Sequence, residues 1–308
     1  MKALLIDADS KRGFPNLALM KISAWLKAQG DTVELIQGIP ETAPIEEFDE
    51  VYISCIYFQN KERVLDYASQ FECPVSIGGS GFSLEKNLNI AIEHTMPDYS
   101  LYDVDFSMGF TSRGCIRHCG FCIVPRKEGQ IREHSPIEEF LHPDHKKVVL
   151  LDNNFQASPL WNEKLQYIID RGLKVNFNQG LDIRLVTPEF ASMLADTKYY
   201  SFNFKTRGFH IAFDMMHLKD AFLKGMNILK DSGIRTDHIM VYILVGYTTT
   251  HQEDLERVNT VIQQGAKPYI MRYNQSREKH MNNLARWVNR KYYEFIPWNQ
   301  YQGSVTQE

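Results

Sequence analysis

Short apolar runs and helical periodicity alternate along the first third of the chain. Four apolar runs predict buried strands, at residues 3–7, 32–36, 51–56 and 74–77. Residues 16–29 and 61–70 carry apolar side chains at helical spacing, and the first of these segments stops at Gly30, a typical helix C-cap. This alternation predicts a parallel, Rossmann-like sheet over residues 1–98.

A longer alternation follows a polar segment at residues 94–104, which we interpret as a linker. Six strands are expected, at residues 106–110, 147–151, 174–177, 200–204, 239–245 and 268–271. Helices are expected between them, at residues 136–141, 160–171, 188–195, 218–232 and 252–264. This α/β pattern predicts a (β/α)6 partial barrel over residues 99–275, followed by a helical tail at residues 276–308. Such barrels carry their sites at the carboxyl ends of the strands.

Composition narrows the class of protein. The chain has 308 residues, of which 44% are hydrophobic and 23% charged, as in globular proteins and unlike disordered or collagen-like ones. The net charge of −4 gives no sign of bulk nucleic-acid binding. No apolar run is long enough to span a bilayer, and residues 1–10 do not resemble a signal peptide. We therefore expect a cytoplasmic protein with no membrane partner.

Three of the five cysteines lie within eight residues, in the order CxxxCxxC: Cys115, Cys119 and Cys122. An odd, crowded set is a poor disulfide framework and indicates a metal site. Three thiolates on one loop can reach three corners of a [4Fe–4S] cluster and leave one iron free to chelate a small molecule. Two alternatives are a zinc site completed by His118 and buried cysteines spaced by chance.

The segment 111–125 resembles the cluster loop of the radical S-adenosylmethionine (SAM) superfamily, and the resemblance covers roughly residues 105–272. It implies a radical SAM partial TIM barrel, a [4Fe–4S] cluster on the three cysteines, and reductive cleavage of SAM to start radical chemistry. Phe121 would lie near the SAM adenine. The implied partners are an electron donor such as flavodoxin or ferredoxin and an unidentified substrate, which is a small molecule, a peptide or an RNA. The sequence names no catalytic residue.

The resemblance assigns seven more residues to SAM binding: Asp152, Asn153, Asn154, Gln179, Arg184, Asp214 and Gly246. The first three follow the second barrel strand, where the superfamily binds the SAM amino group, and Gln179 lies in the similar segment 177–184. Arg184 would pair with the SAM carboxylate, Asp214 with ribose hydroxyls, and Gly246 would lie beside adenine. The alternatives are a turn cluster at residues 152–154, a structural salt bridge between Arg184 and Asp182, and a helix cap at Asp214.

Residues 1–98 resemble the cobalamin-binding domain that precedes many radical SAM barrels, through Ser54 after the third strand and Gly78-Gly79 after the fourth. Asp9 stands where that family has its cobalt-ligating histidine, and Gly13 comes one place late. Cobalamin is therefore either bound without a protein ligand or lost. If it binds, the chain is a cobalamin-dependent radical SAM methyltransferase.

A third hypothesis comes from the basic, aromatic tail. Arg and aromatic side chains there would suit a non-catalytic iron–sulfur protein that binds nucleic acid or acts as a sensor. The alternative is that Leu284, Trp287 and Val288 pack a tail helix across the barrel mouth.

Overall fold

A computed structural model describes residues 1–10, 14–276 and 278–301. The chain divides into two compact units, which are described separately. The first comprises Met1–Thr111, Ile123–Gly129 and His134–Val148, and the second comprises Ser112–Cys122, Gln130–Glu133 and the chain from Val149 onward. The domain boundaries expected at residues 98 and 275 stay a prediction.

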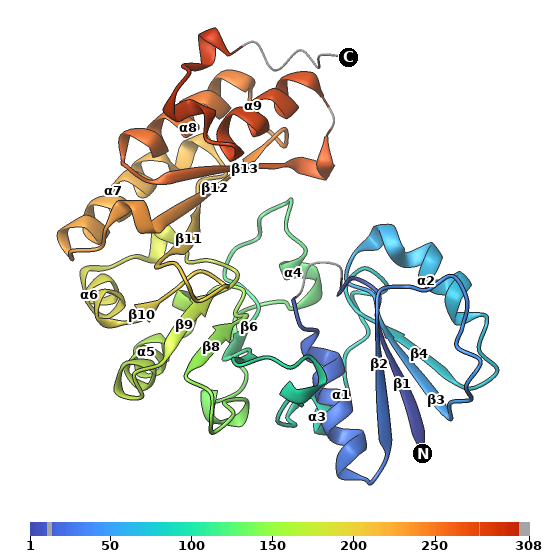
Figure 1. Ribbon diagram of the computed structural model, residues 1–308. Helices are drawn as coiled ribbons and strands as arrows, with labels where there is room; N and C mark the ends of the chain where they lie inside the picture. Colours follow the sequence, from blue (N-terminus) through green and yellow to red (C-terminus); the bar gives the residue numbers. More distant parts are fainter. Residues whose placement is uncertain (11–13, 277, 302–308) are drawn as a thin grey trace. The chain divides into compact units, whose positions relative to one another are not determined.

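The first unit is built on a parallel sheet in the order β2-β1-β3-β4 (Figure 1). Its strands are β1 (Lys2–Asp7), β2 (Thr32–Gln37), β3 (Glu50–Ser54) and β4 (Val75–Gly78). Its two longer helices are α1 (Leu17–Ala28) and α2 (Lys61–Ala68). The strands and helices predicted for residues 1–78 are confirmed.

Strand β1 shows how both faces of this sheet become covered. Ala3 and Leu5 pack in a buried cluster with side chains of α1, such as Leu19. Leu4 and Ile6, which point the other way, pack in a second cluster with side chains of α2. Alternate side chains of a strand face opposite sides, so an entirely apolar strand needs cover on both.

Two contacts at the carboxyl edge of this sheet are specified by residue type. Asn16 caps α1 by accepting the Leu19 N–H at 3.2 Å, and its amide donates to the Ser54 hydroxyl at 2.7 Å. Gly79, directly after β4, has φ of +98°, and a Cβ there would overlap the backbone carbonyl of Cys55. Only glycine fits that position.

The remaining elements of the first unit are short. They are α3 (Ile90–Glu93), β5 (Ser107–Gly109), α4 (Val124–Lys127) and 3-10 turns at Tyr99–Leu101 and Ile137–Glu139. The helix expected at residues 136–141 is thus a single 3-10 turn.

The second unit contains separate groups of strands. Strands β8 (Lys147–Leu150), β9 (Lys174–Phe177) and β10 (Lys198–Tyr199) are neighbours in one sheet. Strands β11 (Phe209–Ala212), β12 (Ile239–Val245) and β13 (Lys267–Arg272) form another, parallel throughout. A short antiparallel pair joins β6 (Ser112–Arg113) to β7 (Arg132–Glu133).

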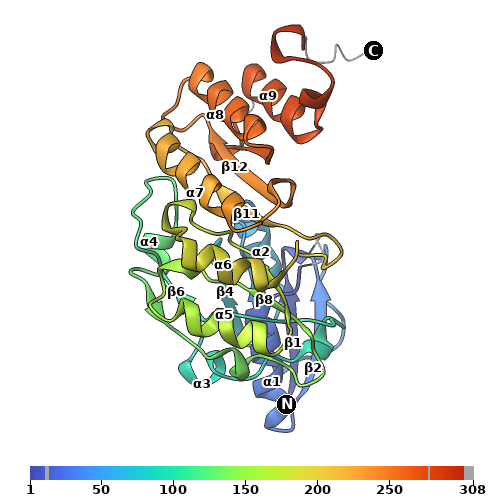
Figure 2. The ribbon, with the colours of Figure 1, turned by 90° about the vertical axis from the view of Figure 1, so that its left-hand side faces the viewer.

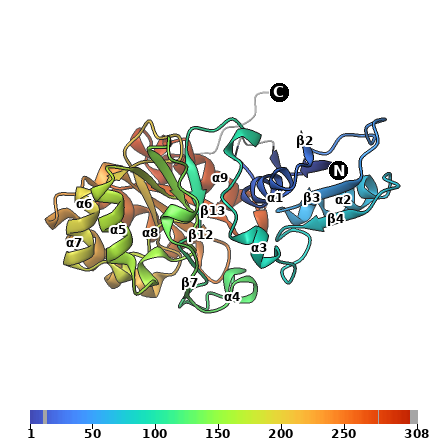
Figure 3. The ribbon, with the colours of Figure 1, turned by 90° about the horizontal axis from the view of Figure 1, so that it is seen from below.

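Helices lie along these strands. They are α5 (Trp161–Asp170), α6 (Pro188–Asp196), α7 (Lys219–Asp231), α8 (His251–Gln263) and α9 (Lys279–Asn289). Figures 2 and 3 show α5, α6 and α7 side by side on one side of the strands. Along β12 every second residue from Ile239 to Val245 is buried, which leaves the intervening side chains on the opposite face.

The predicted fold was a Rossmann-like sheet followed by one radical SAM partial TIM barrel. The prediction of the barrel is wrong. The expected barrel strands fall into separate sheets, with an isolated bridge between Leu181 and Ile211. No strand forms at residues 200–204: β10 ends before them, and Phe204 has φ of +53°. The Asn203 carboxamide oxygen there accepts from the Ser201 hydroxyl and the Lys205 N–H, both at 2.9 Å, which favours a turn over strand pairing. The described residues form a mixed α/β fold with several parallel sheets.

The tail is a packed helix followed by 3-10 turns. Helix α9 buries Met281, Leu284, Trp287 and Val288 and lies against β13. The burial of the tail helix is therefore confirmed, although the barrel mouth on which it was expected to lie is absent from the described residues. None of the helices in the described ranges has the length and apolar content needed to cross a bilayer.

Candidate functional site

The three clustered cysteines lie on a loop of the second unit, beside a cavity of about 450 Å³. Cys115 and Cys119 line this cavity together with other residues of their loop. The rest of the lining comes from residues after β8 and β9 and from residues within or after β11 and β12. The three thiols are half-buried, and none of them is in a disulfide. Burial raises the pKa of Cys119, as do the charges of Cys122 and Cys115, whereas Arg184 lowers it.

This donor set suits an iron–sulfur cluster. Within the described residues, no three His, Cys, Asp or Glu side chains converge as they would around a single ion. In a cubane cluster each thiolate binds a different iron, so its ligands are spread more widely than those of one ion. His118, the proposed fourth zinc ligand, is exposed, and its Nε2 lies 2.9 Å from Nε2 of Gln130. Three thiols on one cavity-lining loop are the type of ligand that a [4Fe–4S] cluster takes.

The polar residues directly after β8 hold the cysteine loop. The Asp152 carboxylate accepts hydrogen bonds from the Ser112 N–H and hydroxyl, both at 2.6 Å. The Asn153 carboxamide oxygen accepts the Gly114 N–H at 2.9 Å. The side chains expected to bind the SAM amino group thus anchor the chain that leads into Cys115.

Asn154 bonds to the first cysteine itself. Its Nδ2 lies 3.4 Å from Sγ of Cys115 and 3.3 Å from Oδ2 of Asp182. Its Oδ1 is buried and has no hydrogen-bond partner among the described residues. The amide therefore links the cysteine loop to the segment after β9.

Asp182 joins two guanidinium groups beside the thiols. Its carboxylate accepts from Arg117 Nε at 3.1 Å and from Arg184 Nε and Nη2 at 2.6 and 3.0 Å. Burial raises the pKa of Asp182, but Arg184 and Arg117 outweigh it and the net pKa is lowered. Arg184 therefore forms the structural salt bridge with Asp182 that was the alternative to pairing with the SAM carboxylate. One carboxylate between two guanidiniums leaves a net positive charge, which favours anionic sulfur ligands.

The other predicted residues are placed as follows. Phe121 and Gln179 line the cavity, and the Phe121 ring packs edge-on against Tyr247 with centroids 5.4 Å apart. Asp214 lines it too, accepts the Leu244 N–H at 3.0 Å, and has its pKa raised by burial.

Two expectations about the cavity walls change. Asp214 is not a helix cap, because Met215 holds the N-cap position of the 3-10 turn that follows it. Gly246 has φ of +78°, but the space that a side chain there would enter is taken by the Met281 thioether. Gly246 therefore packs against α9.

Sequence reasoning missed several residues that line the cavity. Tyr242 lies within the strand predicted at residues 239–245 and Tyr247 lies just after it, and period-two alternation along β12 would have separated Tyr242 from its buried neighbours. His217 and Met215 follow β11, which was not recognised as a strand. Arg117, within the cysteine motif, gave no signal of its pairing with Asp182.

In the first unit, Asp9 does not replace a cobalt-ligating histidine. Its carboxylate accepts the Ile56 N–H, the Tyr57 N–H and the Asn60 amide, at 2.5, 3.2 and 2.6 Å. Both oxygens are thus engaged with the loop after β3, so these residues do not fit a protein-ligated cobalamin. Gly13 lies outside the described residues. Burial raises the pKa of Cys55 to about 11, as expected for a buried strand-end thiol.

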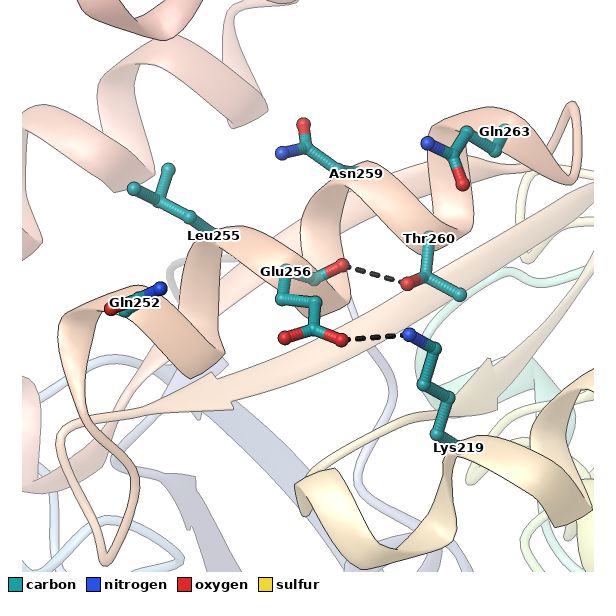
Figure 4. Close-up of a pocket in the computed structure, with 7 residues that line it drawn as sticks. All are labelled: Lys219, Gln252, Leu255, Glu256, Asn259, Thr260 and Gln263. Atoms are coloured by element: carbon teal, nitrogen blue, oxygen red, sulfur yellow. Dashed lines mark hydrogen bonds and ion pairs between the residues drawn. The ribbon is translucent and has the colours of Figure 1, made fainter.

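A second cavity, of about 400 Å³, is lined by Lys219 of α7 and by side chains of α8 (Figure 4). Its Lys219 and Glu256 side chains pair with each other at 2.7 Å, and the Thr260 hydroxyl bonds to the Glu256 carbonyl. These groups satisfy one another on an exposed helix face, so the cysteine cavity is the better candidate.

The comparisons with known proteins give no family. No family model and no curated protein match the chain. A solved structure, the transcriptional repressor ascG of Escherichia coli, shares 13% identity over 88% of this chain and 95% of its own, with a TM-score of 0.19, too low to assign a fold. The predicted membership of the radical SAM superfamily, with its cobalamin-domain relatives, is therefore wrong: no model of that superfamily matches, and the described part of the chain does not form the barrel that defines it.

Proposed function

We propose that this protein is an iron–sulfur enzyme that binds SAM at the cysteine cavity and cleaves it reductively. The proposal rests on the donor set, not on family membership. The observation that carries it is the group of three thiols on one loop, beside a cavity that also presents Arg184 and Asp214. A bound, reduced [4Fe–4S] cluster would supply one electron to the sulfonium of SAM, which gives methionine and a 5′-deoxyadenosyl radical.

The chain's own residues would bind and orient the nucleotide. Phe121 and Tyr247 give the cavity an aromatic wall for a purine ring. Asp214 offers a half-buried carboxyl group to ribose hydroxyls. The Arg117–Asp182–Arg184 group carries a net positive charge beside the thiolates. The same charge would attract the carboxylate of SAM. The substrate stays unassigned.

The first test is anaerobic reconstitution with iron and sulfide. We expect four irons per chain in the intact protein and loss of the cluster from Cys115→Ala, Cys119→Ala and Cys122→Ala variants. Cys73→Ala is the matched control and should keep its iron. The second test is formation of 5′-deoxyadenosine from SAM under dithionite. A fully loaded protein that forms none, or a purified protein that holds zinc instead, would refute the proposal.

The other two hypotheses receive less support. The engaged Asp9 carboxylate does not favour a cobalamin-dependent methyltransferase. The aromatic tail packs on itself, with the Trp287 and Trp298 ring centroids 5.4 Å apart and the Trp287 indole N–H donating to the Ile296 carbonyl. Side chains used in this way are less available to stack on bases.

A further inference from the structure

Cys115 receives two N–H hydrogen bonds, from two different segments of the chain. The Arg117 backbone N–H lies 3.3 Å from its sulfur, and Asn154 Nδ2 lies 3.4 Å from it. The first donor belongs to the cysteine loop itself. The second comes from the turn after β8, where Asn154 is only 5% exposed.

The orientation of the Asn154 amide is dictated by its neighbours. Both atoms within reach of Nδ2, the sulfur of Cys115 and Oδ2 of Asp182, are acceptors. A flipped amide would place its oxygen against both of them and lose both bonds. Asp182 is in turn held by Arg117 and Arg184, so it gives the amide a fixed anchor. Asn154 is therefore a rigid donor to the sulfur.

We infer that Asn154 is a positioning residue that fixes Cys115 and raises the reduction potential of the cluster bound there. This inference rests on the proposed function. Reduction adds negative charge to a cluster and its sulfur ligands, and N–H donors to sulfur stabilise that charge, so they favour the reduced form. The residue type matters, because aspartate, which has nearly the same shape, would present only oxygens to the sulfur.

The test is a redox titration of the anaerobically reconstituted full-length protein, followed by electron paramagnetic resonance. Asn154→Leu removes the donor, and we expect the reduction equilibrium constant to fall about threefold to tenfold, a shift of about 30 to 60 mV at 59 mV per tenfold for one electron. Asn154→Asp adds negative charge and should shift the potential further in the same direction. The matched control is Gln156→Leu, which removes a buried amide of the same turn whose oxygen accepts the Asp182 N–H and not a bond from Cys115. Its potential should equal that of the wild type.

Equal potentials in the wild type and both Asn154 variants would overturn the inference. Loss of the cluster from both Asn154 variants, with retention in Gln156→Leu, would support the fixing of Cys115. Loss from Gln156→Leu as well would overturn a specific role, because the whole turn would then be responsible. A wild-type protein that takes up no cluster would refute the proposed function itself and is thus distinguishable.

Discussion

The carboxylate of Asp152 accepts both the backbone N–H and the hydroxyl of Ser112, at 2.6 Å each. The two residues are 3% and 0% exposed, so water does not replace these bonds when one partner is lost. They fix the chain three residues before Cys115. The geometry of the cysteine loop therefore depends on the turn after β8.

We expect Asp152→Leu to destabilise the protein by about 3 kcal/mol, because it leaves two buried donors of Ser112 without an acceptor. Asp152→Asn keeps one acceptor oxygen and should cost only about 1 kcal/mol. Urea unfolding followed by circular dichroism measures both. Equal stabilities of the two variants would show that the Ser112 bonds do not hold the loop.

The Asp182 carboxylate should make stability depend on pH. Its pKa is lowered in the folded protein by Arg184 and Arg117 against the opposing effect of burial, from an ordinary value of 3.8. The stability that this carboxylate contributes is thus present at pH values above its ordinary pKa and is lost as the pH falls through the folded pKa. The wild type should exceed Asp182→Asn in free energy of unfolding at neutral pH, and the difference should shrink below pH 3.8. A difference that does not vary with pH would contradict this.

Asp214 should behave in the opposite way. Burial raises its pKa, so ionisation opposes folding: the stability is fully present below the ordinary value of 3.8 and falls as the pH rises through the folded pKa. Asp214→Asn cannot ionise, and its amide oxygen can still accept the Leu244 N–H. We expect this variant to be more stable than the wild type at neutral pH and equal to it in acid. Denaturant titrations from acid to neutral pH measure this difference in stability. A variant that is less stable than the wild type at neutral pH would contradict the expectation.

Two adjacent glycines of the first unit should respond differently to alanine. Gly79 has φ of +98°, and a Cβ there meets the Cys55 backbone, whereas a Cβ at Gly78 meets nothing within 4 Å. Gly79→Ala should cost about 2 to 4 kcal/mol, from left-handed strain and overlap, and Gly78→Ala less than about 1 kcal/mol. Thermal unfolding of the pair tests this, and similar melting temperatures would refute it.

The sequence by itself determined the four parallel strands of the first unit and the cysteine loop. Both are short-range features: an apolar run such as residues 3–7 predicts a buried strand without knowledge of its partners, and three thiols within eight residues must share one loop. The period of α9 likewise predicted its buried side.

Only the tertiary structure decided how the later strands group and which partners the polar residues choose. A strand pattern does not record where a sheet stops, and at residues 200–204 local side-chain bonds favour a turn. The bond from Asp152 to Ser112 spans 40 positions, and that from Arg117 to Asp182 spans 65. Pairings at such separations depend on how β8 and β9 bring their ends together, because spacing in the sequence carries no information about distances across the fold.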